Sequence, residues 1–510
     1  MTTIERPFQL SDQADAARFW FLDLIHNPRA LPPLSADLFC LNSAFSPIGL
    51  DSRVVNGYVY NSPRTVGAPP AVPELPPGVA LRNWETRYLP AVREVYEALR
   101  DQPYAGMTAP EILAFFRSQL EPRGIAFGDT VRAAMEIGPE AERLAQFLEA
   151  KLGVEGDLLS ATLLHGSGSD TRSLGNEVQQ LARDARRSPA VLGALQSRDF
   201  AAALASPEEP WASTLRQFLA AHEDEIALWS EIHEPAWNED PLPLLRLVAA
   251  TLDAGESERH DAAAAAMEQV RSRLAPADLP EFEAALAVSR DYVPVIEHRA
   301  RWQLKLCGGV RKSVVALANR LVEEGALEDA NDIFFVHYEE LDAAVAGVLD
   351  ARPLVASRRA EWREQLQLTP PLTLGLPVPY EMLGAVNPMM RRMFGAIAVT
   401  APTATTIGGI GASGGVVRGR ARIVTSLAEA EELQDGDILV CPSTSPPWSP
   451  YFAVVAAVVT DAGGMISHAA IEAREYGIPA VVGTREATRK IPEGATITVD
   501  GSAGTVTLEA

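Results

Sequence analysis

The sequence contains little of several features that mark particular protein classes. Only three cysteines occur in 510 residues, and Cys40, Cys307 and Cys441 are not spaced as metal ligands. We therefore expect reduced thiols, as in a cytoplasmic protein, with neither a disulfide framework nor a metal site. No segment approaches the roughly 18 apolar residues of a membrane helix. The N-terminus also lacks the apolar stretch of a signal peptide.

Basic residues are also scarce relative to acidic ones. The chain has 44 Lys and Arg against 67 Asp and Glu, which gives a formal net charge of −23. Nucleic acids and anionic membranes bind basic surfaces, so neither is an expected partner. The hydrophobic content of 47% is ordinary for a folded protein. The length predicts two to four domains.

The composition and periodicity of the sequence change twice along the chain. Up to about residue 85 it is rich in proline, with helical periodicity only over 12–25. Helix-forming segments then follow one another to about residue 362. A Thr-, Ala- and Gly-rich stretch precedes short β-branched segments. We predict a multidomain protein, with a large, mainly α-helical substrate domain over 1–400, a hinge over 401–415 and a small α/β domain over 416–510.

The expected strands of the small domain are short and separated by turn signals. Asp435-Gly436 is one such turn. The predicted strands span 416–425, 438–441, 454–460, 480–483, 496–500 and 505–508.

His468 lies in the most informative segment of the chain, at the predicted start of a helix over 469–476. The segment before it contains the pair Gly463-Gly464, where backbone can approach a ligand closely. Ser467 is a good N-cap, and Gly477 is suited to end the helix. A helix N-terminus favours anions, and a neutral imidazole is a nucleophile, so this position suits a phosphoryl group carried on nitrogen. The alternative is a histidine that only caps or packs.

The segment resembles the swivelling phosphohistidine domain of the phosphoenolpyruvate-utilising enzymes. The resemblance implies that His468 is phosphorylated, that Thr460 hydrogen-bonds near the imidazole, and that Gly463 and Gly464 make room for phosphate. Residues 441–450 resemble the strand-to-loop segment of the same family. The matching positions are Thr460, Gly463, Gly464, Ser467, His468, Ala470, Ala473, Arg474, Glu475, Gly477, Ile478, Pro479, Ala480 and Val481.

A phosphohistidine needs a phosphoryl donor and an acceptor. The sequence has no glycine-rich phosphate loop, and no counterpart of the ATP-grasp domain or of the pyruvate-handling barrel of complete relatives is recognisable. The resemblance therefore implies a separate ATP-grasp subunit as partner, which would bind ATP and Mg²⁺. We expect this chain to supply the carrier and the acceptor domain.

The helical region resembles, more patchily, the acceptor subunit of phenylphosphate synthase and 4-methylphenyl phosphate synthase, and the corresponding part of rifampicin phosphotransferase. This resemblance implies a small, hydroxylated, aromatic substrate. The matching pieces are Trp20-x-x-Asp23-x-x-His26, 163–166, 235–241 and a block from 301 to 335.

Two cations in that block are candidates for holding the transferring group. Glu297, Arg301 and Lys305 are spaced four residues apart and share one helix face. Phosphoryl transfer needs charge neutralisation and positioning, which Arg301 and Lys305 could supply. An exposed, salt-bridged helix face is the alternative.

Three histidines are candidate bases for an acceptor hydroxyl, and aromatic residues could line its pocket. The histidines are His26, His233 and His298, and for each of them a structural or surface role outweighs the catalytic one. The pocket candidates are Phe19, Trp20, Tyr58, Tyr60 and Trp302.

These observations lead to one hypothesis with two alternatives. An ATP-grasp partner cleaves ATP to AMP and phosphate and phosphorylates His468, which then passes the group to a phenolic hydroxyl. The first alternative is an antibiotic or natural-product phosphotransferase whose ATP domain is supplied in trans. The second is a non-catalytic phosphoacceptor or regulatory scaffold.

Overall fold

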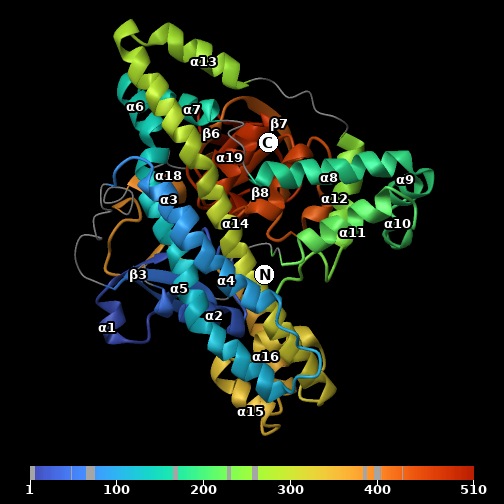
Figure 1. Cartoon of the computed structure of the whole chain (residues 1–510). Coiled ribbons are helices and arrows are strands. Elements are labelled where there is room, and N and C mark those ends of the chain that lie inside the picture. Colours follow the sequence, from blue (N-terminus) through green and yellow to red (C-terminus); the bar gives the residue numbers. More distant parts are fainter. Residues whose placement is uncertain are drawn as a thin grey trace. The chain divides into compact units, whose positions relative to one another are not determined.

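The structure is a computed structural model, whose helices and strands are drawn in Figure 1. The chain divides into two compact units. Unit 1 comprises Met1–Glu136, Leu228–Pro235 and Arg299–Met382, and unit 2 comprises Ile137–Ala227, Ala236–His298 and Leu383–Ala510. Of these, the structure describes residues 6–46, 49–64, 75–164, 170–224, 226, 231–254, 262–382, 388–395, 403, 405–427 and 429–509. Within these ranges, none of the helices combines the length and apolar character needed to cross a bilayer.

Unit 1 combines helices with a four-stranded antiparallel sheet of order β2-β3-β1-β4. Its strands are β1 (Phe19–Leu22), β2 (Leu50–Val55), β3 (Tyr58–Pro63) and β4 (Thr373–Gly375). Its helices are α1 (Gln13–Ala16), α2 (Pro33–Phe45), α3 (Val79–Asn83), η1 (Trp84–Tyr88), α4 (Leu89–Arg100), η3 (Ala330–Phe335), η4 (Tyr338–Glu340), α15 (Leu341–Val345) and α16 (Arg352–Gln365). Two long helices, α5 (Ala109–Ala141) and α14 (Leu279–Glu323), contribute residues to both units.

The helix expected over 12–25 is wrong in its second half. Only 13–16 are helical, and Phe19–Leu22 form β1. This strand is paired on both sides, Phe21 with Asn61 of β3 and Trp20 with Leu374 of β4. A short apolar run fits a buried strand or a buried helix equally well from sequence, and the pairing partners decide between them.

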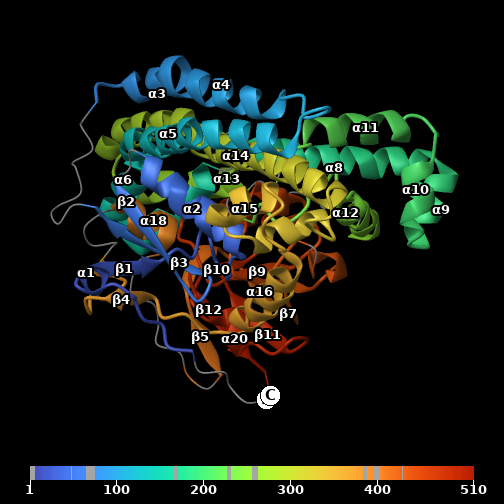
Figure 2. The same ribbon diagram turned by 90° about the horizontal axis from the view of Figure 1, so that it is seen from below.

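Unit 2 contains an eight-stranded mixed sheet of order β5-β12-β11-β7-β8-β9-β10-β6 (Figure 2). Its four central strands, from β7 to β10, are parallel to one another. The strands are β5 (Thr406–Gly408), β6 (Ile410–Ser413), β7 (Val416–Ile423), β8 (Ile438–Cys441), β9 (Ala457–Thr460), β10 (Ala480–Val482), β11 (Thr496–Asp500) and β12 (Thr505–Leu508).

The helices of unit 2 come from both the predicted substrate domain and the small domain. They are α6 (Arg143–Leu152), α7 (Val154–Leu163), α8 (Asp170–Arg187), α9 (Pro189–Gln196), α10 (Phe200–Ala205), α11 (Trp211–Ala221), α12 (Leu242–Ala254), α13 (Ala262–Arg273), η2 (Pro276–Asp278), α18 (Pro388–Phe394), η5 (Glu429–Glu432), η6 (Pro446–Ala453), α19 (His468–Tyr476) and α20 (Ala487–Lys490). Alternate residues of a strand point to opposite faces of a sheet. In β8, Leu439 and Cys441 join a core with α8 and α12, whereas Ile438 and Val440 join one with α20.

The sheet begins earlier than the expected domain boundary at 416. Its two edge strands, β5 and β6, lie within 401–415 and pair with β12 and β10. Residues 406–413 are therefore part of the α/β fold in this structure. A hinge elsewhere in that stretch, and the division of the whole chain into domains, stay predictions.

Candidate functional site

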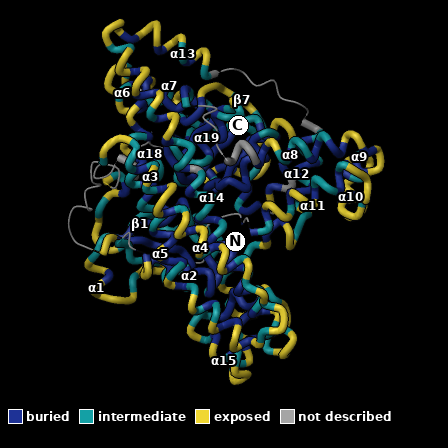
Figure 3. The backbone as a smooth tube through the Cα atoms, in the orientation of Figure 1, coloured by how far each residue is buried: buried dark blue, intermediate teal, exposed yellow. Residues whose placement is uncertain are grey.

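His468 is the first residue of α19, as the sequence predicts. Ser467 is the N-cap, with an extended backbone at φ −69° and ψ 157°, and Gly477 ends the helix at φ 67°. Figure 3 shows the backbone around α19 mainly in the colours of buried and intermediate residues. The imidazole is thus held at a helix N-terminus inside the fold of unit 2.

Two hydroxyl groups flank the imidazole of His468. The Oγ1 atom of Thr444 lies 2.9 Å from Nδ1, and the Oγ atom of Ser449 lies 3.1 Å from Nε2. Thr444 lies in the loop after β8, and Ser449 lies within η6. A neutral imidazole has one N–H and one lone pair, and a hydroxyl can donate or accept. The pair therefore suits the neutral ring in either tautomer.

Burial keeps this imidazole neutral. Its side chain is 10% exposed, and burial lowers the pKa of His468 to about 3 because desolvation penalises the charged form. The nearest carboxylate oxygen, on Glu472, lies 3.9 Å from Nε2, beyond hydrogen-bonding distance. At neutral pH the ring is therefore a neutral nitrogen nucleophile.

The η6 segment that carries Ser449 is rigidly packed. Trp448, Tyr451 and Phe452 are buried and belong to the hydrophobic core that includes α8 and α12. The Phe452 ring stands edge-on to the His468 ring, with centroids 6.1 Å apart. The hydroxyl partner of Nε2 is thus fixed by its apolar neighbours.

Gly464 of the glycine pair lies against the backbone of α18. The Gly464 N–H donates to the Met393 carbonyl at 3.0 Å, and the Ile466 N–H donates to the Arg392 carbonyl at 3.1 Å. A Cβ at Gly464 would collide with the Arg392 carbonyl oxygen. In this structure the absence of a side chain at Gly464 therefore makes room for the backbone of α18, and a role of the glycine pair beside phosphate stays a prediction.

Thr460 differs from expectation, and Ser467 occupies the expected N-cap position without a side-chain cap hydrogen bond. The Thr460 hydroxyl donates to the Ala462 carbonyl at 2.6 Å, so it stabilises the loop, and Thr444 takes the place beside the imidazole that was expected for Thr460. The buried Ser467 Oγ has no hydrogen-bond partner among the described residues. Thr444 and Ser449 were missed because only their place in the loop at 441–450 marks them.

Three arginines support the loop around His468. The Arg474 guanidinium donates to the carbonyls of Ala412 and Met465, each at 2.8 Å. On α18, Arg392 pairs with Asp157 of α7 at 2.9 Å, with side chains 7% and 15% exposed. Arg391 pairs with Glu149 of α6 at 2.9 Å, with both side chains 39% exposed. The residues that pin the loop are therefore themselves tied to the helices of unit 2.

Arg301, Trp302 and Lys305 lie in unit 1, on α14. The Lys305 ammonium stands 5.3 Å from the Tyr96 ring centroid, and Trp302 packs edge-on against Tyr96 at 5.5 Å. The side chain of Glu297 lies outside the described residues. Because His468 belongs to unit 2, a role of Arg301 and Lys305 at the phosphohistidine stays a prediction.

The three candidate bases have different surroundings. The His26 Nδ1 atom lies 3.0 Å from the Asp23 carboxylate in unit 1. The ring nitrogens of His233 are buried and have no hydrogen-bond partner among the described residues. Burial lowers the pKa of His233 to about 4. His298 is a half-buried residue of α14 in unit 2.

Trp20, Tyr58 and Tyr60 are core residues rather than walls of an open pocket. All three are nearly inaccessible to solvent. The hydroxyl of Tyr60 donates to the Pro371 carbonyl at 2.8 Å, and that of Tyr58 donates to the Leu368 carbonyl at 3.1 Å. Phe19 is only half-buried and stacks on Phe21 at 6.3 Å.

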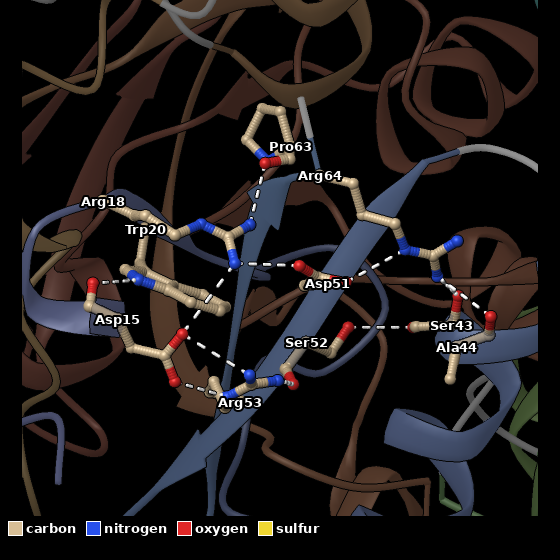
Figure 4. Close-up of polar contacts among 10 residues, drawn as sticks. All are labelled: Asp15, Arg18, Trp20, Ser43, Ala44, Asp51, Ser52, Arg53, Pro63 and Arg64. Atoms are coloured by element: carbon tan, nitrogen blue, oxygen red, sulfur yellow. Dashed lines mark hydrogen bonds and ion pairs between the residues drawn. The ribbon is translucent and has the colours of Figure 1, made fainter. Parts of the chain in front are cut away.

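Trp20 is surrounded by charged groups that hold the sheet of unit 1 together (Figure 4). Its Nε1–H donates to the Asp15 carbonyl at 2.8 Å. The guanidinium groups of Arg18 and Arg53 lie 4.8 Å and 5.3 Å from its ring centroid. The Asp51 carboxylate joins Arg18 to Arg64. These contacts give Trp20 a structural role.

Across the described ranges, no group of three or more His, Cys, Asp or Glu side chains is arranged to hold a metal ion.

Two known families match segments of this chain. Residues 433–504 match the PEP-utilising enzyme mobile domain, the segment that holds His468, Thr444 and Ser449. The chain therefore carries a segment similar to the mobile domain of the phosphoenolpyruvate-utilising enzymes. Residues 130–297 match the rifampicin phosphotransferase fourth domain, so this part of the chain resembles rifampicin phosphotransferase.

Curated relatives agree with this assignment. A rifampicin phosphotransferase from a Streptomyces species is 29% identical over 90% of this chain and 54% of its own length. Chondramide synthase of Chondromyces crocatus is 28% identical over 99% of this chain but 14% of its own length. An uncharacterized phosphotransferase of Bacillus subtilis is 36% identical over 38% of this chain and 23% of its own length. The chain thus spans about half, or less, of these relatives.

Proposed function

We propose that this protein is a phosphotransferase in which His468 carries a phosphoryl group to the hydroxyl of a small acceptor. The observation that supports this most is the buried, neutral imidazole held between two hydroxyls in a mobile domain of the phosphoenolpyruvate-utilising enzymes. A neutral ring nitrogen keeps the lone pair that attacks phosphorus.

The proposed reaction has two half-reactions. First, a ring nitrogen of His468 attacks the β-phosphorus of ATP and the P–O bond to AMP breaks. Water then removes the terminal phosphoryl group as phosphate, and the β-phosphoryl group stays on the ring. A separate ATP-grasp subunit is proposed to bind that nucleotide with its Mg²⁺. Second, the acceptor oxygen attacks the phosphorus, and the P–N bond breaks with its electron pair returning to the His468 ring. Arg301 and Lys305 are proposed to neutralise the charge of the group in transfer.

We further propose a phenol or a similar small aromatic alcohol as the acceptor. The alternative acceptor is a larger natural product such as a rifamycin. It is favoured by the relative named rifampicin phosphotransferase, which aligns with 90% of this chain. A scaffold that accepts phosphate without passing it on is the third candidate.

The test is intact-mass analysis of the full chain with ATP and Mg²⁺, alone and with an ATP-grasp protein encoded beside it. We expect a phosphate only with the partner, absent in His468→Ala and present in the control His337→Gln. Phosphorylation of His468→Ala would contradict the proposal, and phosphorylation by ATP alone would contradict the separate donor subunit.

Discharge then separates the acceptors. Purified phosphoprotein is mixed with phenol, 4-methylphenol or rifampicin, and loss of the phosphate is followed with appearance of the aryl or rifamycin phosphate. Phenol or cresol phosphate supports the small acceptor, and rifampicin phosphate supports the alternative. A stable phosphoprotein with all three would favour the scaffold.

A further inference from the structure

Arg123 of α5 is buried without the oxygen partners that other buried arginines of this protein have. The side chain of Arg392 is 7% exposed and pairs with Asp157 at 2.9 Å, and the buried Arg474 donates to two backbone carbonyls. Arg123 is 5% exposed. Among the described residues its guanidinium forms no ion pair, and its Nε atom has no hydrogen-bond partner. A buried cation without a counter-charge is costly, so this position favours an anion.

The hydrogen bond that Arg123 does form is a weak one. Its Nη2 atom donates to the Sγ atom of Cys307 on α14 at 3.2 Å. Burial raises the pKa of the Cys307 thiol and outweighs the opposite effect of the nearby guanidinium. The sulfur is therefore a neutral thiol and a weak acceptor. This contact positions the guanidinium in unit 1 but does not neutralise it.

A second buried polar atom without a partner lies where α2 meets α5. A Cβ on Gly124, the residue after Arg123, would come 3.2 Å from the Asn42 carbonyl oxygen, so the two helices are in close contact there. Asn42 is 4% exposed, and its Oδ1 atom has no hydrogen-bond partner among the described residues. The same helix junction thus holds an unsatisfied donor and an unsatisfied acceptor that do not bond to each other. Such a pair is expected around a bound polar molecule.

We propose that this junction of α2, α5 and α14 binds the carboxylate of a small organic acid against Arg123. The Nε–H and an Nη–H of a guanidinium form a fork that matches the two oxygens of a carboxylate. Among the described residues, only Arg123 acts electrostatically on Cys307, so the site supplies a single positive charge. One carboxylate neutralises that charge, whereas a phosphate dianion would leave a buried negative charge. The site lies within unit 1 and goes beyond the function proposed above.

The test observes the guanidinium directly. The full chain is labelled with ¹⁵N in its arginines, and the Nε–H signal of Arg123 is identified by its loss in Arg123→Met. Formate and acetate are the probes, because they are small enough for a nearly closed site. We expect both to shift this signal saturably, since the Nε–H gains a charge-assisted hydrogen bond. No saturable shift with either probe would overturn the proposal. Tighter binding of inorganic phosphate than of both carboxylates would overturn the choice of a carboxylate.

A second measurement, urea denaturation without any added acid, does not depend on the choice of probe. Replacing an unpaired buried cation with an apolar side chain of similar length removes its cost. We therefore expect Arg123→Met to unfold at a higher urea concentration than wild type, and acetate to stabilise wild type but not this variant. A lower midpoint for Arg123→Met would overturn the proposal, because the guanidinium would then be satisfied in the empty protein.

The matched control is Arg117→Met on the same helix. Arg117 pairs with Asp342 at 2.7 Å, and the two side chains are 31% and 68% exposed. This variant should keep the shift of the Arg123 signal with acetate and should not gain stability. None of these outcomes depends on phosphorylation of His468, so the carboxylate site and the proposed phosphotransferase can each fail without the other.

Discussion

His468 and the candidate base His26 have opposite surroundings. His468 of unit 2 is bonded by two neutral hydroxyls, on Thr444 and Ser449. His26 of unit 1 is bonded to the ionised carboxylate of Asp23. Hydroxyls can stabilise a neutral ring in either tautomer, whereas a carboxylate selects the Nδ1–H tautomer and stabilises the charged ring. The first environment suits a nucleophile and the second suits a base.

The largest expected effect comes from giving His468 the environment of His26. In Ser449→Asp, a carboxylate would stand beside Nε2 and raise the pKa of the ring, and a protonated imidazole has no lone pair. We expect phosphorylation to slow by more than about 100-fold, against less than about 10-fold in Ser449→Ala. The measurement is the initial rate of phosphoprotein formation by mass spectrometry, after circular dichroism has verified folding. Equal rates in the two variants would show that a carboxylate beside the His468 ring does not impair its role as nucleophile.

The support of the His468 loop should depend on one arginine more than on its neighbour. Arg392→Gln breaks a largely buried pair with Asp157 and should lower the free energy of unfolding by about 3–5 kcal/mol. Arg391→Gln breaks the more exposed pair with Glu149 and should cost about 0–1 kcal/mol. Urea denaturation measures both. Equal losses of unfolding free energy in the two variants would contradict a larger contribution from the buried pair than from the exposed one.

Removing one hydroxyl tests whether the neutral ring needs both partners. Thr444→Val keeps the shape of the side chain but leaves a buried Nδ1 unsatisfied, which costs about 1–3 kcal/mol. If this free-energy cost raises the barrier to phosphoryl transfer, phosphorylation should slow by about tenfold or more. The rate is measured as for Ser449→Asp. An unchanged rate would show that Thr444 contributes only packing.

The smallest expected effect is the change in folding stability with pH near neutrality. Because burial lowers the pKa of His468 to about 3 from an ordinary 6.5, the unfolded chain takes up a proton between these values while the folded chain does not. Stability therefore falls as pH falls through that window. Between about pH 7 and 6 this one group should account for less than about 1 kcal/mol. Comparing the urea denaturation of wild type and His468→Gln at both pH values isolates the contribution of this histidine. The opposite sign would mean that the ring is charged in the folded protein.

Local sequence signals predicted the helix that carries His468 because its determinants are neighbours in the chain. Ser467 begins the helix and Gly477 ends it at φ 67°, a conformation that glycine adopts without strain. The hydroxyls of Thr444 and Ser449 lie 24 and 19 residues before the histidine. No local rule connects positions so far apart, so their contacts were not predictable without a structure.

The sequence predicted that a group approaches Gly464 closely, but it did not predict which group. Gly464 permits a close approach, as expected, but the approaching group is the backbone of Arg392, 72 residues earlier in the chain. The aromatic residues Trp20, Tyr58 and Tyr60 were expected near a pocket. They became core residues because sheet pairing buries them and brings backbone carbonyls to their polar atoms.

By itself, the sequence determined the change from helices to an α/β fold, most strand positions of that fold, and the identity of His468 as the candidate nucleophile. These depend on local periodicity, on capping residues and on a contiguous motif. Only the tertiary structure decided which hydroxyls hold the imidazole, which carboxylate holds His26, and which aromatic residues are inaccessible. Each depends on distant segments that meet only when burial and strand pairing bring them together.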